Sequence, residues 1–191
     1  MKKYLIKARK LKDKAKLILD ELDIIRILKK VGRVEIVGSY ALDLMSWEDI
    51  DITVTGELDY KKYLEVANYM FQKEKVYSLN LQDFRKSIYP NRPQGIYLGV
   101  KYLEDPDIFW KIDIWFFNKG ERSAKDIVEF VKENITKEKR EIILNIKNKI
   151  REKTESGKEI SGKEVYEAVL REGIEDLRGF KRYMTSKGFK W

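Results

Sequence analysis

The stretch VGSYALDLMSWEDIDIT, residues 37–53, decides the fold. An apolar strand runs into Gly-Ser, and the chain returns as a second strand with the pattern Asp-Ile-Asp-Ile. Because side chains alternate along a strand, Asp49 and Asp51 lie on one face and the isoleucines on the other. Two carboxylates at this spacing repel each other unless a cation lies between them. A hard divalent ion such as Mg²⁺, which prefers oxygen ligands, suits this position.

The turn before these acids has the composition of a phosphate site. Gly38 allows a tight turn, and Ser39 opens a short segment, residues 40–45, whose pattern allows a helix. Free backbone N–H groups and a small hydroxyl at the start of a helix can hold a phosphate. We therefore expect a phosphate cradle and a pair of metal-binding carboxylates within one unit of the βαβ type.

The order of apolar strand, Gly-Ser, short spacer and Asp-apolar-Asp-apolar resembles the signature of the polymerase-β-type nucleotidyltransferase superfamily. The resemblance covers roughly residues 34–117. In that superfamily the Gly-Ser loop holds a nucleoside triphosphate, and two Asp residues carry two Mg²⁺ ions. The resemblance implies that Gly38 and Ser39 bind the nucleotide, and that Asp49 and Asp51 bind metal.

The superfamily also uses a third carboxylate, from a later strand, to position or deprotonate the attacking hydroxyl. Asp113 is the candidate here, because it lies among apolar residues in WKIDIWF, residues 110–116. Lys111 shares its strand face and is expected to reach a phosphate. The resemblance implies that Asp113 completes the metal and catalytic set. An acid on an edge strand that faces water is the alternative interpretation.

Residues 85–95 are predicted to form a loop that faces the substrate, since they contain two of the three prolines. Arg85 and Arg92 in this stretch are candidates for binding the triphosphate tail. The alternative is that both are ordinary surface charges.

The amino-acid composition excludes several kinds of functional site. The chain of 191 residues contains neither cysteine nor histidine. Disulfides, thiolate or imidazole zinc sites and serine–histidine mechanisms are therefore excluded. Acid–base and metal chemistry must fall to carboxylates, with Lys and Tyr as lesser candidates. With 43% hydrophobic and 38% charged residues, the composition is typical of a globular protein.

Charge is unevenly distributed. Residues 1–36 hold 12 Lys and Arg against 5 Asp and Glu, residues 37–136 hold 13 against 17, and residues 137–191 hold 15 against 10. An acidic centre suits metals, and basic flanks suit a polyanion such as a triphosphate or RNA. Solvated helix faces are the alternative. No apolar run approaches the length that spans a bilayer, and no secretory signal is evident, so we expect a cytoplasmic protein without a membrane partner.

The remaining periodicities predict helices and strands around this centre. Helices are expected over 3–30 (one or two), 60–73, 122–134, 136–153, 162–171 and 174–186, and strands over 76–81, 95–103 and 109–117. The predicted fold is α/β (α+β), with a small mixed β-sheet nucleotidyltransferase core, an N-terminal helix and a C-terminal helical region. We place the nucleotidyltransferase-like domain in residues 1–134 and the helical subdomain in residues 135–191.

The function predicted by the resemblance is metal-dependent transfer of a nucleoside monophosphate from an NTP, with ATP as the first candidate, to a hydroxyl. Two Mg²⁺ ions are expected, and pyrophosphate is released. A small molecule or protein is the predicted acceptor, and RNA is the alternative. A non-catalytic nucleotide- or RNA-binding module of the same fold is a further alternative. The pattern defines neither the preferred NTP nor the oligomeric state.

Overall fold

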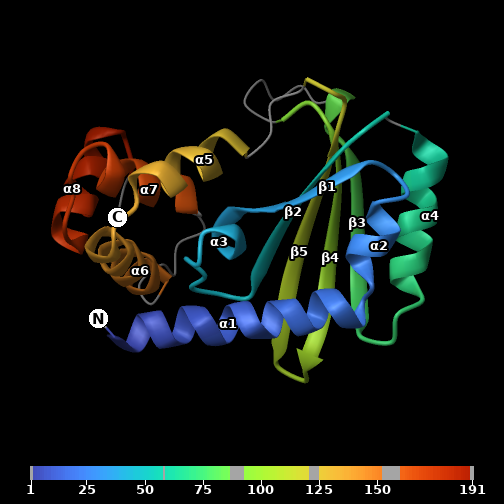
Figure 1. Ribbon diagram of the computed structural model, residues 1–191, viewed down its shortest axis with the longest axis horizontal. Helices are drawn as coiled ribbons and strands as arrows, with labels where there is room; N and C mark the ends of the chain where they lie inside the picture. The colour runs from blue at the N-terminus through green and yellow to red at the C-terminus, as the bar shows by residue number, and fades with distance from the viewer. Residues whose placement is uncertain (1, 58, 87–92, 121–124, 152–159, 190–191) are drawn as a thin grey trace.

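A five-stranded sheet forms the centre of the computed structural model, which describes residues 2–57, 59–86, 93–120, 125–151 and 160–189. The spatial order is β1-β2-β5-β4-β3 (Figure 1). The strands are β1 (Arg33–Val37), β2 (Asp49–Thr55), β3 (Val76–Asp83), β4 (Ile96–Asp105) and β5 (Ile108–Phe117). β2 and β5 are parallel, and the other neighbouring pairs are antiparallel. The prediction of a small mixed sheet is confirmed.

The helices form two groups. They are α1 (Lys2–Glu21), α2 (Ile24–Leu28), α3 (Gly38–Ala41), α4 (Tyr60–Phe71), α5 (Lys125–Asn134), α6 (Lys137–Arg151), α7 (Gly162–Leu170) and α8 (Leu177–Ser186), with a 3-10 turn η1 (Phe84–Lys86). α1, α2 and α4 cover one face of the sheet, and α5 to α8 gather at its other side (Figure 1). Among the described helices, none is both long and apolar enough to cross a membrane.

The first core lies between the sheet and the helices α1, α2 and α4. Alternation along the strands places every second residue on this face, and Ile50, Ile52 and Ile114 are fully buried there. The aliphatic stripe of α1 packs on the same core through Leu11, Ala15 and other residues. The intervening strand residues, including the three candidate acids, therefore project from the opposite face.

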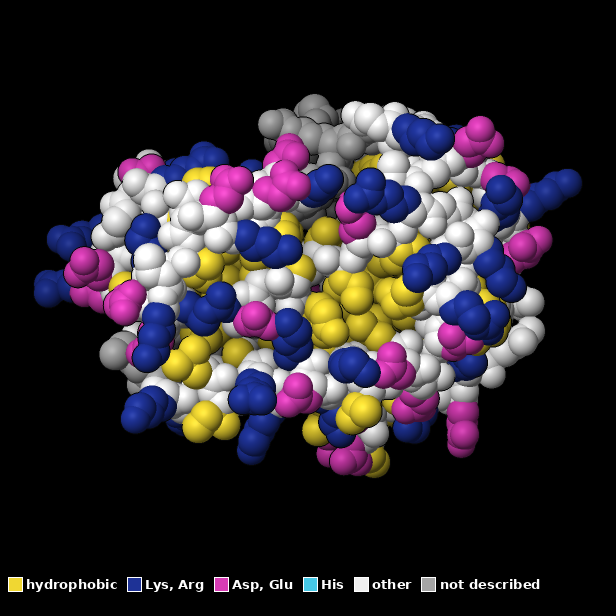
Figure 2. Space-filling view, in the orientation of Figure 1, with side chains coloured by type: hydrophobic (Ala, Val, Ile, Leu, Met, Phe, Trp, Pro, Cys, Tyr) yellow, Lys and Arg dark blue, Asp and Glu magenta, His cyan; other side chains and the backbone are white. Residues whose placement is uncertain are grey.

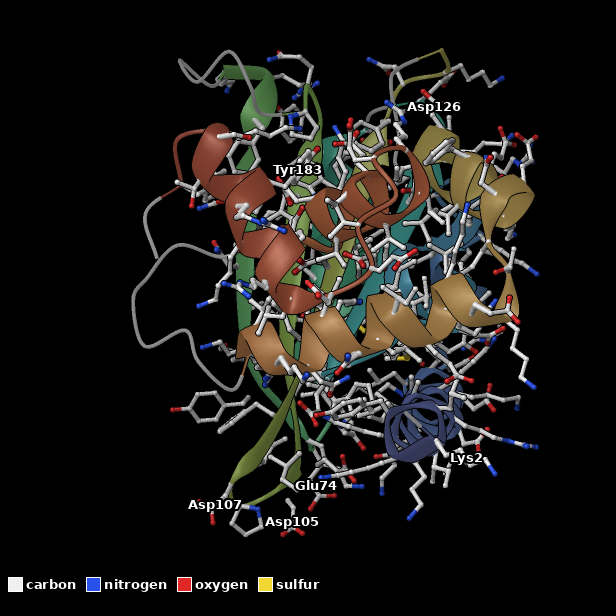
Figure 3. The ribbon with its side chains drawn as sticks, turned by 90° about the vertical axis from the view of Figure 1, so that its left-hand side faces the viewer. Lys2, Glu74, Asp105, Asp107, Asp126 and Tyr183 are labelled. Carbon is white, nitrogen blue, oxygen red and sulfur yellow. The ribbon has the colours of Figure 1, made fainter. Side chains whose placement is uncertain are left out.

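The second core belongs to the helices α5 to α8. It also contains Ala8 of α1 and Val37, Leu42 and Leu44 from the region around α3. Seen from the side, α6, α7 and α8 lie in front of the sheet, and Asp105 and Asp107 project from the tip of the β4–β5 hairpin beyond them (Figure 3). The predicted C-terminal helical region is confirmed. α5 contributes Val128 and Val131 to this core, and the domain division at residue 134 stays a prediction.

The unit β1–α3–β2 differs from the predicted βαβ unit. β1 and β2 are antiparallel neighbours, with Val37 opposite Asp51. A parallel pair needs a crossover of about a dozen residues or more, usually a full helix. α3 has only 4 residues, so the chain turns back and β2 pairs directly alongside β1. The Gly-Ser turn consequently lies beside the acids.

Candidate active site

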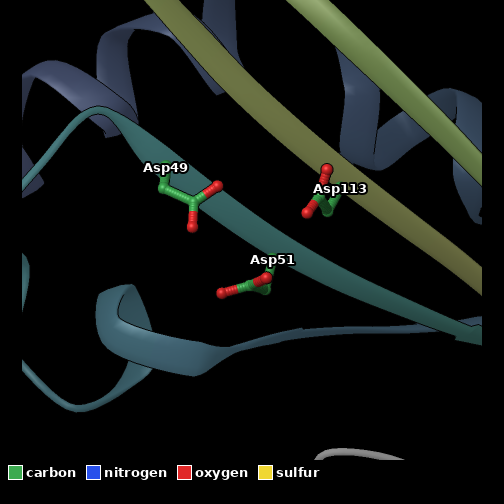
Figure 4. A group of neighbouring side chains, drawn as sticks. All are labelled: Asp49, Asp51 and Asp113. Atoms are coloured by element: carbon green, nitrogen blue, oxygen red, sulfur yellow. The ribbon is translucent and has the colours of Figure 1, made fainter. Parts of the chain in front are cut away.

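Three carboxylates meet on the sheet face that lies away from the first core. Asp51 of β2 is in register with Asp113 of β5, and Asp49 is in register with Lys111. Because β2 and β5 are neighbours, the alternation of each strand brings all three acids to one place (Figure 4). One oxygen from each acid lies within 4.8 Å of those of the other two. The structure thus brings together the three residues predicted for metal binding.

Burial makes the acids of β2 hard to ionise. Burial, reinforced by the charge of Asp113, raises the pKa of Asp49. Burial and the charges of Asp49 and Asp113 raise the pKa of Asp51 to about 7. The buried Oδ1 of Asp49 has no hydrogen-bond partner among the described residues. A buried carboxylate oxygen without a partner is costly, and a bound cation would remove that cost. The donor set therefore fits a hard divalent ion.

Asp113 has partners on both of its oxygens. The Tyr97 hydroxyl donates to Oδ1 at 2.7 Å, and the Lys111 ammonium lies 2.7 Å from Oδ2. The side chain of Asp113 is 13% exposed, whereas that of Lys111 is 50% exposed. Lys111 therefore lies at the open side of the three acids, where it could also meet a phosphate. Its predicted role in nucleotide binding stays a prediction.

The Gly-Ser turn packs directly against Asp51. Gly38 adopts a left-handed conformation, with φ of 61°, that L-residues with a side chain rarely adopt. A Cβ at this position would overlap the Asp51 carboxylate. Ser39 is 8% exposed, and its carbonyl accepts a hydrogen bond from the Leu44 amide at 2.9 Å. Both predicted nucleotide-binding residues of the turn are thus adjacent to the acids.

The two arginines predicted to bind nucleotide have different positions. Arg85 lies in η1 after β3, the edge strand that is separated from β2 by β4 and β5. Its Nε donates to Asp83 Oδ1 at 2.9 Å and its Nη2 to Asp83 Oδ2 at 3.0 Å. Arg92 lies outside the described residues. Nucleotide binding by Arg85 stays a prediction, since its guanidinium is already held by an acid.

Lys147 of α6 is a site residue that the sequence analysis missed. It is 1% exposed, and its ammonium donates to the Leu44 carbonyl at 2.7 Å and lies 4.6 Å from the Trp47 ring centroid. Burial lowers its pKa to about 7, against the charges of Asp49 and Asp51, which raise it. A signal was present, because three of the neighbours of Lys147 at three or four residues along the helix are apolar, namely Ile143, Leu144 and Ile150.

Other α6 side chains bind the same connection, residues 42–48, which leads from α3 to β2. These contacts are Arg140 to the carbonyls of Leu42 and Asp43, Asn148 to the Ser46 hydroxyl, and Arg151 to the Glu48 carboxylate. Arg140, Lys147 and Arg151 recur at intervals of seven and four, and Asn148 lies three residues before Arg151, so the four side chains lie on one side of α6. The helical region thus fixes the segment that delivers Asp49.

Comparison with solved structures identifies the fold. The chain matches Cid1 poly(U) polymerase, an H336N mutant bound to MgATP, with a TM-score of 0.62 at 13% identity, covering 86% of this chain and 51% of that chain. It matches a cytoplasmic RNA terminal U-transferase with a TM-score of 0.60 at 12% identity, covering 91% and 55%. CdnC of E. coli MS115-1 with ATP gives a TM-score of 0.52 at 16% identity, covering 95% and 67%.

These matches define the class of fold. The chain has the polymerase-β-type nucleotidyltransferase fold, as the sequence pattern predicted. It spans about half the length of the first two structures. No family model and no curated protein matches the sequence.

Proposed function

We propose that this protein is a Mg²⁺-dependent nucleotidyltransferase, which moves a nucleoside monophosphate from an NTP to a hydroxyl and releases pyrophosphate. The observation that carries the proposal is the group of three carboxylates with oxygens within 4.8 Å, beside the Gly-Ser turn. ATP is the first candidate for the NTP. Two structures of the same fold support it, because one contains MgATP and the other ATP. Fold likeness alone does not establish activity, so the argument rests on the site.

Asp49, Asp51 and Asp113 would hold the metal, and the superfamily resemblance implies two ions. Their chemistry fits, since all three offer carboxylate oxygens and Asp49 Oδ1 has no partner among the described residues. When bound, Mg²⁺ would neutralise charge on the triphosphate and lower the pKa of the attacking hydroxyl.

The protein's own residues would position the reactants. Ser39 and the backbone of the turn would hold the phosphates, with Lys111 near the triphosphate. Asp113 would orient the acceptor hydroxyl and accept its proton. The acceptor oxygen forms a bond to the α-phosphorus of the NTP. The bond between the α-phosphorus and the oxygen that bridges it to the β-phosphate breaks, and pyrophosphate leaves with that oxygen. Catalysis in this scheme comes from positioning and electrostatics.

The proposed acceptor is a hydroxyl of a small molecule or protein. Figure 2 shows Lys and Arg side chains interspersed with Asp and Glu on the visible face. The basic side chains on this face do not form one continuous patch, which is the arrangement that favours long contacts with RNA. RNA is the second candidate, because two solved structures of this fold are a poly(U) polymerase and an RNA terminal U-transferase. A binding-only module has no physical need for three clustered acids.

Isothermal titration with a non-hydrolysable ATP analogue, with and without Mg²⁺, tests the site. We expect Mg²⁺-dependent binding that Asp49→Asn and Asp51→Asn abolish. Asp20→Asn is the matched control, because Asp20 lies on α1 and its 63% exposed side chain pairs with Lys16 at 2.8 Å. Full metal-dependent binding by both Asp49→Asn and Asp51→Asn, or its loss in Asp20→Asn, would contradict the proposal.

Transfer itself is tested with α-labelled NTPs. We expect pyrophosphate release that requires Mg²⁺ and falls on the order of 100-fold or more in either Asn variant. Incubation with a short RNA, and separately with metabolite and protein fractions, assigns the label to one acceptor class. Label on RNA would establish the second candidate over the first.

A further inference from the structure

Tyr97 holds the third carboxylate through its side-chain hydroxyl. Its hydroxyl donates to Asp113 Oδ1 at 2.7 Å. An Asp carboxyl group rotates easily about its last torsion, so an acid without such a partner has no defined plane. Lys111, the partner of Oδ2, is half-exposed on a flexible stem and can exchange Asp113 for a phosphate. The contact with Tyr97 is therefore the fixed one.

Gly99 makes this contact geometrically possible. In the antiparallel pair β4–β5, Tyr97 lies opposite Trp115, and Gly99 lies opposite Asp113. Tyr97 reaches its diagonal neighbour by laying its ring across Gly99, where a Cβ would overlap the Tyr97 hydroxyl. A glycine inside a strand often marks such a close approach.

Aromatic neighbours keep the Tyr97 ring in place. Its centroid lies 5.2 Å from that of Trp115 and 6.2 Å from that of Phe84. A tyrosine hydroxyl is protonated at neutral pH, so it serves as the donor to Asp113 Oδ1 at 2.7 Å. The ring is therefore packed on its sides, and its polar end is directed at Asp113.

We propose that Tyr97 is a positioning residue, which fixes the Asp113 carboxylate for metal binding and for the acceptor hydroxyl, and that Gly99 provides the space for its ring. The inference rests on the proposed function. It differs from the superfamily pattern in naming a tyrosine and a glycine of β4, outside the signature strands. In this proposal Tyr97 acts through Asp113, the carboxylate that its hydroxyl contacts.

Manganese affinity, measured by electron paramagnetic resonance with a non-hydrolysable ATP analogue present, tests the proposal. We expect Tyr97→Phe, which keeps the ring and removes the hydroxyl, to raise the Mn²⁺ dissociation constant about tenfold, as loss of a partner of a metal ligand typically does. The rate of pyrophosphate release at saturating NTP should fall about as much, with the KM for NTP unchanged.

Tyr102→Phe is the matched control. Tyr102 lies on the same strand, and its hydroxyl likewise donates to a carboxylate at 2.7 Å, that of Glu21, on the opposite face. We expect this variant to lower the thermal unfolding midpoint without changing Mn²⁺ affinity. An equal loss of Mn²⁺ affinity in both variants would mean that Tyr97 contributes only to stability, and would overturn the inference.

Gly99→Ala gives an independent second variant. The added Cβ should push the Tyr97 ring away from Asp113 and raise the Mn²⁺ dissociation constant as Tyr97→Phe does. Gly99→Ala and Tyr97→Phe remove the same interaction, so the double variant should bind Mn²⁺ as tightly as either single variant. A double variant in which the two losses of Mn²⁺ affinity multiply would overturn this inference and leave the proposed function intact. A Tyr97→Phe variant that binds Mn²⁺ as the wild type does would have the same consequence. Absence of Mn²⁺ binding by the wild type would instead overturn the proposed function.

Discussion

The two sides of the candidate site are built in opposite ways. On the β2 side, Asp49 and Asp51 are buried, and in the described part of the chain neither forms an ion pair with a lysine or arginine. On the β5 side, Asp113 already has the Tyr97 hydroxyl and the Lys111 ammonium on its oxygens. The charges of Lys111 and Lys147 lower the pKa of Asp49 and Asp51 without offsetting their burial, whereas Asp113 has a cation and a hydroxyl in direct contact.

This difference assigns distinct tasks to chemically identical side chains. Buried acids whose charge is incompletely compensated are unfavourable in the free protein and become favourable when a cation binds. An acid that already has a cation and a hydroxyl donor is held in place and stays available to a second ligand. The environments therefore predict that the β2 side provides most of the metal affinity and that the β5 side orients Asp113 for the metal and the acceptor.

The largest expected effect is on the stability of the metal-free protein when Asp51 becomes Asn. The pKa of Asp51 is about 7 in the folded protein, against an ordinary value of 3.8 for an aspartate. The folded protein therefore holds more protons between about pH 4 and pH 7, so its stability falls as pH rises through that window. The fall amounts to at most about 4 kcal/mol for this shift. Asp51→Asn should remove this contribution and leave only that of Asp49, whose pKa is also raised by burial.

Chemical denaturation with EDTA at several pH values measures this effect. At pH 8 the variant should be more stable than the wild type, and Mg²⁺ should stabilise only the wild type. Asp43→Asn is the control, because the Asp43 side chain is 57% exposed. An unchanged stability profile in Asp51→Asn would mean that the β2 side is no less solvated than the β5 side, and the comparison would fail.

The next effect concerns the contact between the turn and Asp51. Gly38→Ala introduces a Cβ that overlaps the Asp51 carboxylate and places a side chain at φ of 61°. We expect Mg²⁺-dependent nucleotide affinity to fall on the order of 100-fold, as for loss of a catalytic electrostatic partner. The left-handed backbone should additionally cost about 1 kcal/mol of stability.

Gly173→Ala separates these two contributions. Gly173 has a similar φ of 67°, and no atom lies within 4 Å of an added Cβ. This variant should lose stability by a similar amount and retain nucleotide affinity, as judged by titration calorimetry. Equal loss of affinity in both variants would show that backbone strain, and not the position of Asp51, controls binding.

How much of this site could be predicted from the sequence depends on how far apart in the chain the interacting residues lie. Asp49 and Asp51 share a face because of alternation within one strand, which is a local rule, and the apolar surroundings of Asp113 placed it on a buried strand. The direction of β2 relative to β1 was predicted wrongly, because the short segment after Gly38 had the pattern of a helix but not the length of a crossover.

The interactions that distinguish the two sides depend on tertiary structure. Tyr97 meets Asp113 because of the register of β4 and β5, which alternation alone does not specify. Lys147 lies 98 residues after Asp49 and comes from the helical region. Its apolar neighbours indicated burial, but nothing in the local pattern indicated which loop its ammonium would bind.

A smaller effect is expected from the contact between α6 and the connection to β2. Lys147→Met keeps the length of the side chain and leaves the Leu44 carbonyl without its donor. The connection should then shift, and nucleotide affinity should fall about tenfold. In the folded protein the pKa of Lys147 is lowered from 10.5 to about 7. Between these two pH values the unfolded chain therefore holds more protons than the folded protein. Wild-type stability should therefore rise from pH 7 to 10.5, and the variant should lose this rise.

Denaturation profiles between pH 7 and 10.5 provide the measurement. Lys149→Met on the same helix is the control, because Lys149 is only partly buried and donates to no described loop carbonyl. It should retain both the pH dependence and the nucleotide affinity. A Lys147→Met variant that keeps wild-type affinity would show that β2 holds Asp49 in place without α6, and that the β2 side is rigid by itself.

The smallest effect should come from Lys111→Ala. Its ammonium is half-exposed, so solvent screens its interaction with a phosphate, and we expect nucleotide affinity to fall only about fivefold, less at high salt. Lys101→Ala is the matched control, since Lys101 lies directly opposite Lys111 in the sheet and is exposed on the same face. A specific role predicts a change in Lys111→Ala alone. Equal, salt-sensitive losses in both variants would mean that the β5 side attracts nucleotide through its general positive field, with Lys111 serving mainly as the partner of Asp113.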